Sequence, residues 1–369
     1  GVFYVRDKKR LQMYREQETY IGKVMGADYL KALITNIREH GRAKGDCVAI
    51  EERVSNVDGT NLHKEGYTVS LLFTFADGTQ VPAFFKYNQR QSDFNHPEHN
   101  GNITRFLRER GFKFIPKVLS PSVDEFKSSF DLETGRSSVS SLPSSERVSN
   151  RGLVYEWVDG LNLEWLLDNE SPVTRSGEER EGGVFGMHNI PVNAILSNMW
   201  QVYESPMHDS WTFMKKAGFH ERLVSKLRGG QGETFADVLN QAYRRAMKEN
   251  GVEGNMRVIH GDLHQGNIML LNHDGCLFPA GVVSPNDIKI FDWDNAERGI
   301  PYQDFFHLAI ISDFEKDKGR FANAREKFLQ RQQQIMPEVT ESQLRMIEFE
   351  TYVSLLLRYR GAVQENVIK

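Results

Sequence analysis

The residue types best suited to chemistry gather in one short segment, His260–Asn267, which reads His-Gly-Asp-Leu-His-Gln-Gly-Asn. This polar segment lies between two apolar runs, Val258–Ile259 and Ile268–Leu270, as expected for a loop between short strands. Asp262 and Asn267 lie five positions apart. The spacing suits a carboxylate that orients a hydroxyl nucleophile and an amide oxygen that helps to hold a metal ion.

A second acidic position follows a strand-like run further along the chain. The run Ile288–Phe291 ends in Asp292-Trp293-Asp294, so a carboxylate emerges where the strand ends. Magnesium prefers hard oxygen ligands and keeps several of its waters. We therefore predict a magnesium site made by Asn267 and Asp292, with Asp294 either supporting it or purely structural.

Together these residues resemble the aminoglycoside phosphotransferase and choline kinase superfamily, relatives of the protein kinases. The loop of that superfamily reads His-Gly-Asp-x-His-x-x-Asn, and this chain carries the pattern in full. The resemblance implies ATP and Mg²⁺ as cofactors, Asp262 as catalytic base, and Asn267 and Asp292 as metal ligands. It also implies that His264 faces the transferred phosphate, where protein kinases place a lysine, and that His260 supports the loop.

These positions also have a plainer interpretation. Asp, Asn and His side chains often hydrogen-bond the backbone of a tight turn, so the motif would then be structural. His264 in particular suits a cap of the loop as well as a phosphate contact. Asp304 matches an acid that follows the metal strand in relatives, and we expect it mainly to cap the next helix.

The resemblance extends to residues that would hold the nucleotide. Lys86, near the end of a strand, matches the lysine that contacts the α- and β-phosphates. A strand-like run further on matches the hinge whose backbone meets the adenine, at Glu156, Trp157 and Val158. A plain buried strand would look similar.

Two further nucleotide contacts are less regular. The loop Asn56–Gly66 is expected to lie over the phosphates, with Gly59 allowing close backbone approach, although it lacks Gly-x-Gly-x-x-Gly. The helix glutamate that pairs with the strand lysine in the superfamily falls at Asn100 here. Glu98 is the nearest acid, and it either serves instead, if the helix after Pro97 starts differently, or is solvated.

The rest of the chain supplies the elements that must position these residues. A helix that carries Leu30, Leu33, Ile34 and Ile37 and ends near His40 is predicted first. Three antiparallel strands follow, predicted from runs rich in β-branched and aromatic residues: Val48–Val57, Tyr67–Phe75 and Val81–Tyr87. An extended piece, Phe114–Leu119, forms a further strand. Beyond Asp159 the pattern is mostly helical, and one apolar face of the last helix carries Met346, Phe349, Val353 and Leu356.

We therefore predict an α+β, two-lobed, protein-kinase-like fold with a small antiparallel-sheet N-lobe and a larger, mainly helical C-lobe. Residues 1–156 form the nucleotide-binding lobe, with a leading helix and a mobile loop over residues 120–150 that is rich in serine. Residues 157–369 form the lobe that holds the catalytic loop and the acceptor site.

Composition narrows the class of protein. A formal charge of −4 predicts no nucleic-acid partner, and no run approaches the roughly 18 apolar residues of a membrane span. With only Cys47 and Cys276, a reducing compartment is expected, and we predict the cytoplasm. The chain begins at Gly1 with no charged-then-apolar leader, which suggests a trimmed end.

These features favour an ATP- and Mg²⁺-dependent phosphotransferase that moves the γ-phosphate to a hydroxyl of a small molecule resembling an aminoglycoside, choline or a sugar. The chain lacks Ala-Pro-Glu and leaves little room for a protein-kinase activation segment between Asp292 and Gln303. One alternative is a protein or polymer kinase that docks a macromolecule on Ser120–Asn150 or Asn169–Gly183. Another is a nucleotide-binding pseudokinase without turnover, suggested by Asn100.

Overall fold

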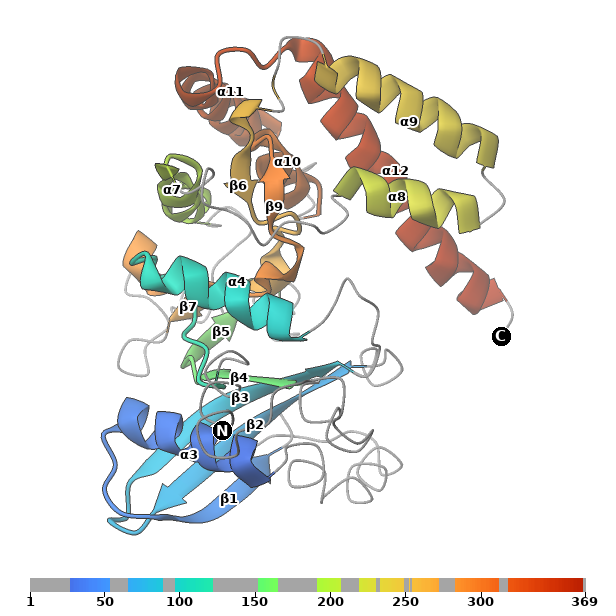
Figure 1. Cartoon of the computed structure of the whole chain (residues 1–369). Coiled ribbons are helices and arrows are strands. Elements are labelled where there is room, and N and C mark those ends of the chain that lie inside the picture. Colours follow the sequence, from blue (N-terminus) through green and yellow to red (C-terminus); the bar gives the residue numbers. More distant parts are fainter. Residues whose placement is uncertain are drawn as a thin grey trace, which may run out of the picture. The chain divides into compact units, whose positions relative to one another are not determined.

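The chain forms two compact units, Gly1–Val158 and Asp159–Lys369. The computed structural model describes residues 27–53, 66–88, 97–121, 152–164, 191–206, 219–229, 233–248, 252, 254–271, 283–311 and 318–367 (Figure 1). The predicted fold class is confirmed, because an antiparallel sheet dominates the first unit and helices dominate the second. The assignment of nucleotide binding to one lobe and catalysis to the other stays a prediction.

The described strands of the first unit form one antiparallel sheet in the order β1-β2-β3-β4. They are β1 (Cys47–Arg53), β2 (Gly66–Phe75), β3 (Gln80–Asn88) and β4 (Gly152–Glu156). A tight turn at Asp77-Gly78 joins β2 to β3, where Gly78 adopts a φ of 82° that glycine reaches without strain. The three strands predicted before residue 88 are thus confirmed, although Phe114–Leu119 forms only a single bridge, Val118 to Tyr155.

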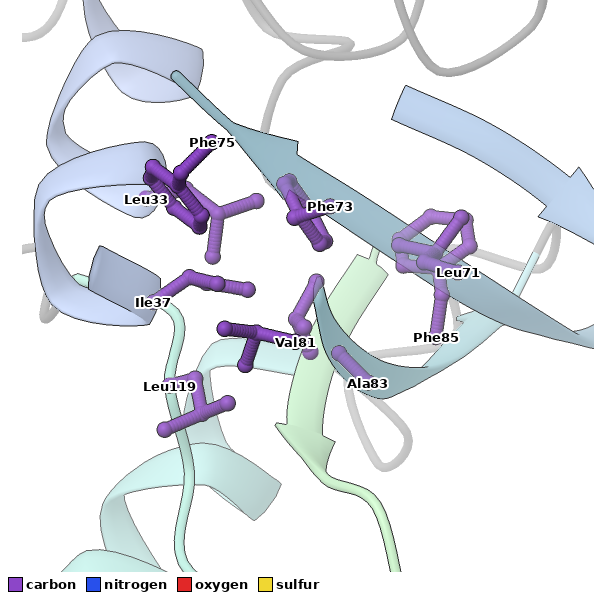
Figure 2. Packing of buried hydrophobic residues seen from close by; sticks show 10 residues of the cluster. Leu33, Ile37, Leu71, Phe73, Phe75, Val81, Ala83, Phe85 and Leu119 are labelled. Atoms are coloured by element: carbon purple, nitrogen blue, oxygen red, sulfur yellow. The ribbon is translucent and has the colours of Figure 1, made fainter. Parts of the chain in front are cut away.

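Helix α3 (Ala27–Gly41) covers one face of this sheet, as Figure 2 shows. Leu33 and Ile37 lie one helical turn apart and are fully buried, while alternate residues of β2 and β3 point to the same core. Side chains one helical turn apart on α3 and alternate side chains of β2 and β3 therefore pack in one apolar cluster. Its other buried members are Leu71, Phe73, Phe75, Val81, Ala83, Phe85, Leu119 and Val154.

Helix α4 (Pro97–Glu109) belongs to the same unit and is tied to the chain that follows it. The Arg105 guanidinium donates to the carbonyl oxygens of Ser120, at 2.5 Å, and Pro121, at 3.0 Å. Ser120 in turn accepts the Val154 N–H at 2.7 Å through its hydroxyl. These bonds join α4 to β4, the strand that leads to the predicted hinge.

The second unit combines helices with two small sheets (Figure 1). One sheet has the strand order β5-β7-β8, and the other pairs β6 with β9. The strands are β5 (Gly160–Asn162), β6 (Arg257–Ile259), β7 (Ile268–Leu271), β8 (Ile288–Ile290) and β9 (Glu297–Gly299). The helices are α7 (Val192–Tyr203), α8 (Phe219–Gly229), α9 (Glu233–Lys248), α10 (Tyr302–Ile311), α11 (Lys318–Ile335) and α12 (Glu341–Val367).

Helix α12 buries only part of the face predicted. Met346 and Val353 are buried against α8 and α9, whereas Phe349 is 47% exposed and Leu356 is 68% exposed. The buried surface instead includes Glu350, whose carboxylate pairs with His220 of α8 at 2.5 Å. A polar residue of α12 is thus buried together with a polar partner on another helix. Among the described residues, no helix combines the length and the apolar character needed to span a bilayer.

Candidate active site

The polar loop predicted from the sequence connects β6 to β7, which belong to different sheets. Its second half is a 3₁₀ turn, Gln265–Asn267, that begins after His264. The His264 Nδ1 atom accepts the Gly266 N–H at 3.0 Å and so caps the turn. A Cβ atom at Gly266 would lie 2.7 Å from the His264 ring, so only glycine fits there without a shift. The capping role left open for His264 is thus present in the structure.

His260 holds the loop from inside. Its side chain is fully buried, and its ring packs against the Trp293 ring with the centroids 4.7 Å apart. The ring Nδ1 accepts the Asp262 N–H at 3.3 Å, and Nε2 lies 2.7 Å from the Phe291 carbonyl oxygen. This pattern fits a neutral ring that carries its proton on Nε2. His260 thereby supports the loop and ties it to the end of β8.

Asp304, in the first turn of α10, fixes the loop backbone. Its buried carboxylate accepts the N–H groups of His260, at 2.7 Å, and Gly261, at 2.9 Å, and the Tyr203 hydroxyl at 3.0 Å. Burial raises the pKa of Asp304, while these donors favour the carboxylate. The expectation that Asp304 mainly caps its own helix is wrong, because its oxygens bond to a loop elsewhere in the sequence.

Gly261 shows why the loop begins with His-Gly. Its φ is 75°, a left-handed conformation that residues with a Cβ rarely adopt. A Cβ atom here would also lie 2.2 Å from the Asn295 carbonyl oxygen. The glycine therefore lets the loop pass close to the turn after β8, which brings Asn295 near Asp262.

Asp262 is the acid of the loop, and its side-chain carboxylate makes only long contacts. Its side chain is 24% exposed. Oδ2 lies 3.5 Å from the Asn295 side-chain nitrogen, and Oδ1 lies 3.7 Å from the His307 Nδ1 atom. Its backbone oxygen, in contrast, accepts the Asn267 side-chain N–H at 2.9 Å. The backbone of Asp262 is thus fixed while its carboxylate stays accessible to a reactant.

Asn267 and Asp292 are brought together by the β7–β8 pair. The Phe291 N–H donates to the Asn267 carbonyl oxygen at 2.8 Å, so Asp292 follows a residue bonded to Asn267. Asp292 has a φ of 59° and a ψ of 53°, a left-handed conformation that is uncommon among residues other than glycine and that aspartate adopts more readily than most. Strand pairing thus gathers the two predicted metal ligands, although they are far apart in the sequence.

The donor set fits magnesium. The Asn267 amide is buried, and its nitrogen is bonded to the Asp262 carbonyl, which turns its oxygen the other way. One amide oxygen and one carboxylate are hard ligands, and Mg²⁺ completes its shell with phosphate oxygens and waters. In the part of the chain that the structure describes, no group of three or more His, Cys, Asp or Glu residues suits a metal. The side-chain oxygens of Asn267 and Asp292 are thus of the kind that would hold Mg²⁺.

The predicted nucleotide residues of the first unit are placed as follows. Lys86 is a half-buried residue of β3 that pairs with Thr68 of β2 and Leu153 of β4. Glu156 ends β4, and its N–H donates to the Lys117 carbonyl oxygen at 2.9 Å; Trp157 and Val158 follow it.

The remaining predicted positions fall partly or wholly outside the described structure. Glu98 and Asn100 both lie in the first turn of α4, but their side chains are not among those described. Gly59 lies outside the described residues, as do residues 122–150 of the predicted mobile loop. Asp294 lies in the 3₁₀ turn Trp293–Asn295, and its side chain is likewise not described.

Sequence reasoning missed two residues that face Asp262. Asn295 follows the Asp-Trp-Asp triplet directly, and His307 lies on α10. One signal was available for His307, because it comes three positions after Asp304 and so shares its helix face. Recognising Asp304 as a ligand of the loop backbone would have pointed to His307 as well.

Comparison with known proteins gives a family match for the part of the chain that contains this site. Residues 206–341 match the model described as APH, phosphotransferase enzyme family. The match includes both His260–Asn267 and Asp292, and it confirms the resemblance and the phosphotransferase class predicted from the sequence. No curated protein matches the chain.

Several solved structures are similar over most of the chain. Aminoglycoside phosphotransferase APH(3'')-Id from Streptomyces rimosus, in complex with ADP and streptomycin, is 16% identical over 88% of this chain and 97% of its own, with a TM-score of 0.46. Ethanolamine kinase from Plasmodium vivax is 11% identical over 96% and 88%, also with a TM-score of 0.46. Macrolide 2'-phosphotransferase MphH from Brachybacterium faecium is 12% identical over 91% and 96%, with a TM-score of 0.42. At these values the likeness carries no argument about activity or substrate.

Proposed function

Residues 206–341 match the model of the phosphotransferase enzyme family, and from this match we propose that the chain moves the γ-phosphate of ATP to a hydroxyl group of a small molecule. The observation that supports the proposal best is the placement of Asp262. Its backbone is fixed by His260 and Asn267, while its carboxylate remains partly exposed. A general base needs this combination of a fixed position and access to the substrate.

Asp262 acts on the acceptor. Its carboxylate receives the hydrogen of the acceptor hydroxyl as the hydroxyl oxygen bonds to the γ-phosphorus, and the bond from that phosphorus to ADP breaks. Phosphoryl transfer depends more on positioning and charge stabilisation than on strong base chemistry. The loop is suited to this task because its backbone is bonded to buried groups, as the contacts of Asp304 with His260 and Gly261 illustrate.

Asn267 and Asp292 would hold Mg²⁺ through their side-chain oxygens. The pairing of β7 with β8 supports this, because it places the two residues close together along the backbone. When bound, the ion neutralises charge on the phosphates. His264 is proposed to contact the transferred phosphate from the loop. Since its Nδ1 atom caps the 3₁₀ turn, the Nε2 atom is the one suited to that contact.

In the first unit, we assign the nucleotide to the residues that the resemblance indicated. Lys86 would contact the α- and β-phosphates, and Gly59 would allow the covering loop to approach them. Glu98 would serve as the partner of Lys86 in place of Asn100. The backbone at the end of β4 would meet the adenine, through Glu156, Trp157 and Val158.

A small acceptor is favoured over a protein because the chain between Asp292 and α10 is short and ordered. It contains only the 3₁₀ turn Trp293–Asn295, strand β9 and a connection to Tyr302. A protein kinase uses this part of the chain for its activation segment. A protein or polymer kinase and a pseudokinase remain the competing functions. We also propose a cytoplasmic location, from the cysteine usage.

The function is tested by incubating the protein with labelled ATP and a panel of aminoglycosides, amino alcohols and sugars, with and without Mg²⁺. Label should reach a small hydroxyl compound only with Mg²⁺, and Asp262→Asn should lower the rate of transfer by about 10²–10⁴-fold. Asp237→Asn is the matched control, because Asp237 is an exposed acid of α9 that pairs with Arg228. Transfer at the full rate in Asp262→Asn, or transfer that goes only to protein, would overturn the proposal.

A further inference from the structure

A histidine outside the sequence motif faces Asp262. His307 of α10 is 8% exposed, and its Nδ1 atom lies 3.7 Å from the Asp262 Oδ1 atom. Its ring also meets the His264 ring edge-on, with the centroids 6.2 Å apart. The side chain thus lies between the loop's aspartate and its second histidine.

Helix α10 therefore reaches the loop at two points. Asp304 binds the loop backbone at His260 and Gly261, and His307, one helical turn later, faces the Asp262 side chain. Since Asp304 anchors α10 to the loop, the distance from His307 to Asp262 is held by the same attachment. A residue placed in this way is suited to fixing the rotation of a neighbouring side chain.

We propose that His307 is a positioning residue that orients the Asp262 carboxylate for phosphoryl transfer; this inference rests on the role proposed above for Asp262. Rotation of a carboxylate about its last bond is only weakly restricted by its own rotamer preference. Here the two oxygens meet different partners, Oδ1 facing His307 and Oδ2 facing Asn295. If His307 is replaced, only one of these two contacts of the Asp262 carboxylate remains, the one with Asn295 at 3.5 Å.

The chemistry assigns a donor role to His307. In the proposed role, Nδ1 of His307 carries a hydrogen and offers it to Oδ1, while Oδ2 of Asp262 receives the hydrogen of the acceptor hydroxyl. The hydroxyl O–H bond breaks, the oxygen bonds to the γ-phosphorus, and the bond from phosphorus to ADP breaks, so no further reactant is needed. At 3.7 Å the pair is at ion-pair distance, and such contacts tighten when substrate binds.

Two substitutions separate this role from a packing role. His307→Leu keeps similar bulk and removes the N–H, whereas His307→Asn keeps an N–H close to the position of Nδ1. Magnesium-dependent turnover of ATP is measured with an acceptor from the panel, or with water as acceptor. Leu should lower kcat by about 10–100-fold with KM for ATP nearly unchanged, and Asn should restore most of it. Equal losses in both variants, with lower melting temperatures, would overturn the proposal.

A double variant tests whether His307 acts through Asp262. In the Asp262→Asn background, His307→Leu should lower kcat by less than about twofold more, because the carboxylate that it orients has been replaced. Full additivity of the two losses would overturn the proposal. The comparison distinguishes His307 from a residue that acts on the nucleotide independently.

A measurement without turnover decides the contact by itself. The ¹⁵N signals of the imidazole rings, with His307 assigned from the spectrum of His307→Asn, are compared between the unaltered protein and Asp262→Asn. The His307 Nδ1 signal should move when the carboxylate is replaced, and an unchanged signal would overturn the inference. If the protein transfers no phosphate with any acceptor while the signal moves, the proposed function fails and the contact stands.

Discussion

The sheet of the first unit and the loop of the second are held in shape by different interactions. The sheet is fixed by apolar side chains such as Leu33, Ile37 and Phe73, which are removed from water. The loop is fixed by hydrogen bonds from the backbone of His260 and Gly261 to the buried carboxylate of Asp304. A loop that must present polar side chains to reactants cannot bury them, so its order comes from its backbone. Stability and activity are therefore expected to respond separately to substitution.

The sharpest separation is expected at Asp262. Asp262→Asn should lower kcat by about 10²–10⁴-fold, because the amide is a poor acceptor for the hydrogen of the hydroxyl. ATP binding and the melting temperature should stay close to those of the unaltered protein, since the carboxylate makes only loose contacts, the shorter of them 3.5 Å from Asn295. Single-turnover kinetics, calorimetric titration with ATP and thermal unfolding measure the three properties. A large drop in melting temperature would show that the loop is not independent of its charged side chain.

The sheet should give the opposite result. Phe73→Ala removes a fully buried ring from the cluster beneath α3 and should cost about 3–5 kcal/mol of unfolding free energy. Denaturant unfolding followed by circular dichroism measures the loss. Where the variant is still folded, kcat should change little, because this cluster lies in another unit from the loop. Val48→Ala, at a 63% exposed position of β1, is the control and should cost less than about 0.5 kcal/mol.

The sequence predicts these two regions from different signals. The strands and the helix that covers them follow from local periodicity, because buried positions repeat every two residues in β2 and every four in α3. The segment His260–Asn267 was predictable for another reason, since its residue types and spacing are specific. Both signals lie within short stretches of chain.

What the sequence did not predict depends on contacts between distant residues. Asp304 lies 44 positions from His260, and only the fold shows that its carboxylate reaches the loop backbone. The face of α12 was only partly predicted: Met346 and Val353 are buried, Phe349 is exposed, and Glu350 is buried because it pairs with His220, 130 positions earlier. A polar residue that finds a buried partner reverses the simple apolar-inside pattern.

A buried carboxylate elsewhere in the second unit, that of Glu297, is expected to make the free energy of unfolding depend on pH. Glu297 of β9 accepts the Phe219 N–H at 2.8 Å, and burial raises its pKa from 4.5 to about 7 although Arg222 lies nearby. The folded protein therefore holds this proton more tightly than the unfolded chain does. The stabilising effect is complete below about pH 4.5 and is lost as the pH rises through about 7, up to about 3 kcal/mol in all.

Glu297→Gln isolates this contribution, because glutamine has a similar shape and does not titrate. Unfolding free energies of the two proteins are compared from pH 5 to pH 8. The difference between them should change in favour of the variant as the pH rises from 5 to about 7, and it should level off above that pH. A constant difference across this range would contradict the assignment of the titration to Glu297.

The smallest expected effect concerns Asp304, whose buried carboxylate is expected to affect both stability and activity. Asp304→Asn keeps one acceptor oxygen and replaces the other with an NH₂ group, which accepts no hydrogen bond. The asparagine therefore cannot bond to both the His260 and the Gly261 N–H. One buried N–H then loses its partner, which should cost about 2 kcal/mol of unfolding free energy. Because the unpaired group lies in the loop, kcat should fall as well, by about tenfold, while Phe73→Ala lowers stability alone. Asp287→Asn, in the turn before β8, is the control, because Asp287 accepts the Ser284 N–H at a site away from the loop. Loss of stability with unchanged kcat would show that the loop keeps its geometry without the second hydrogen bond.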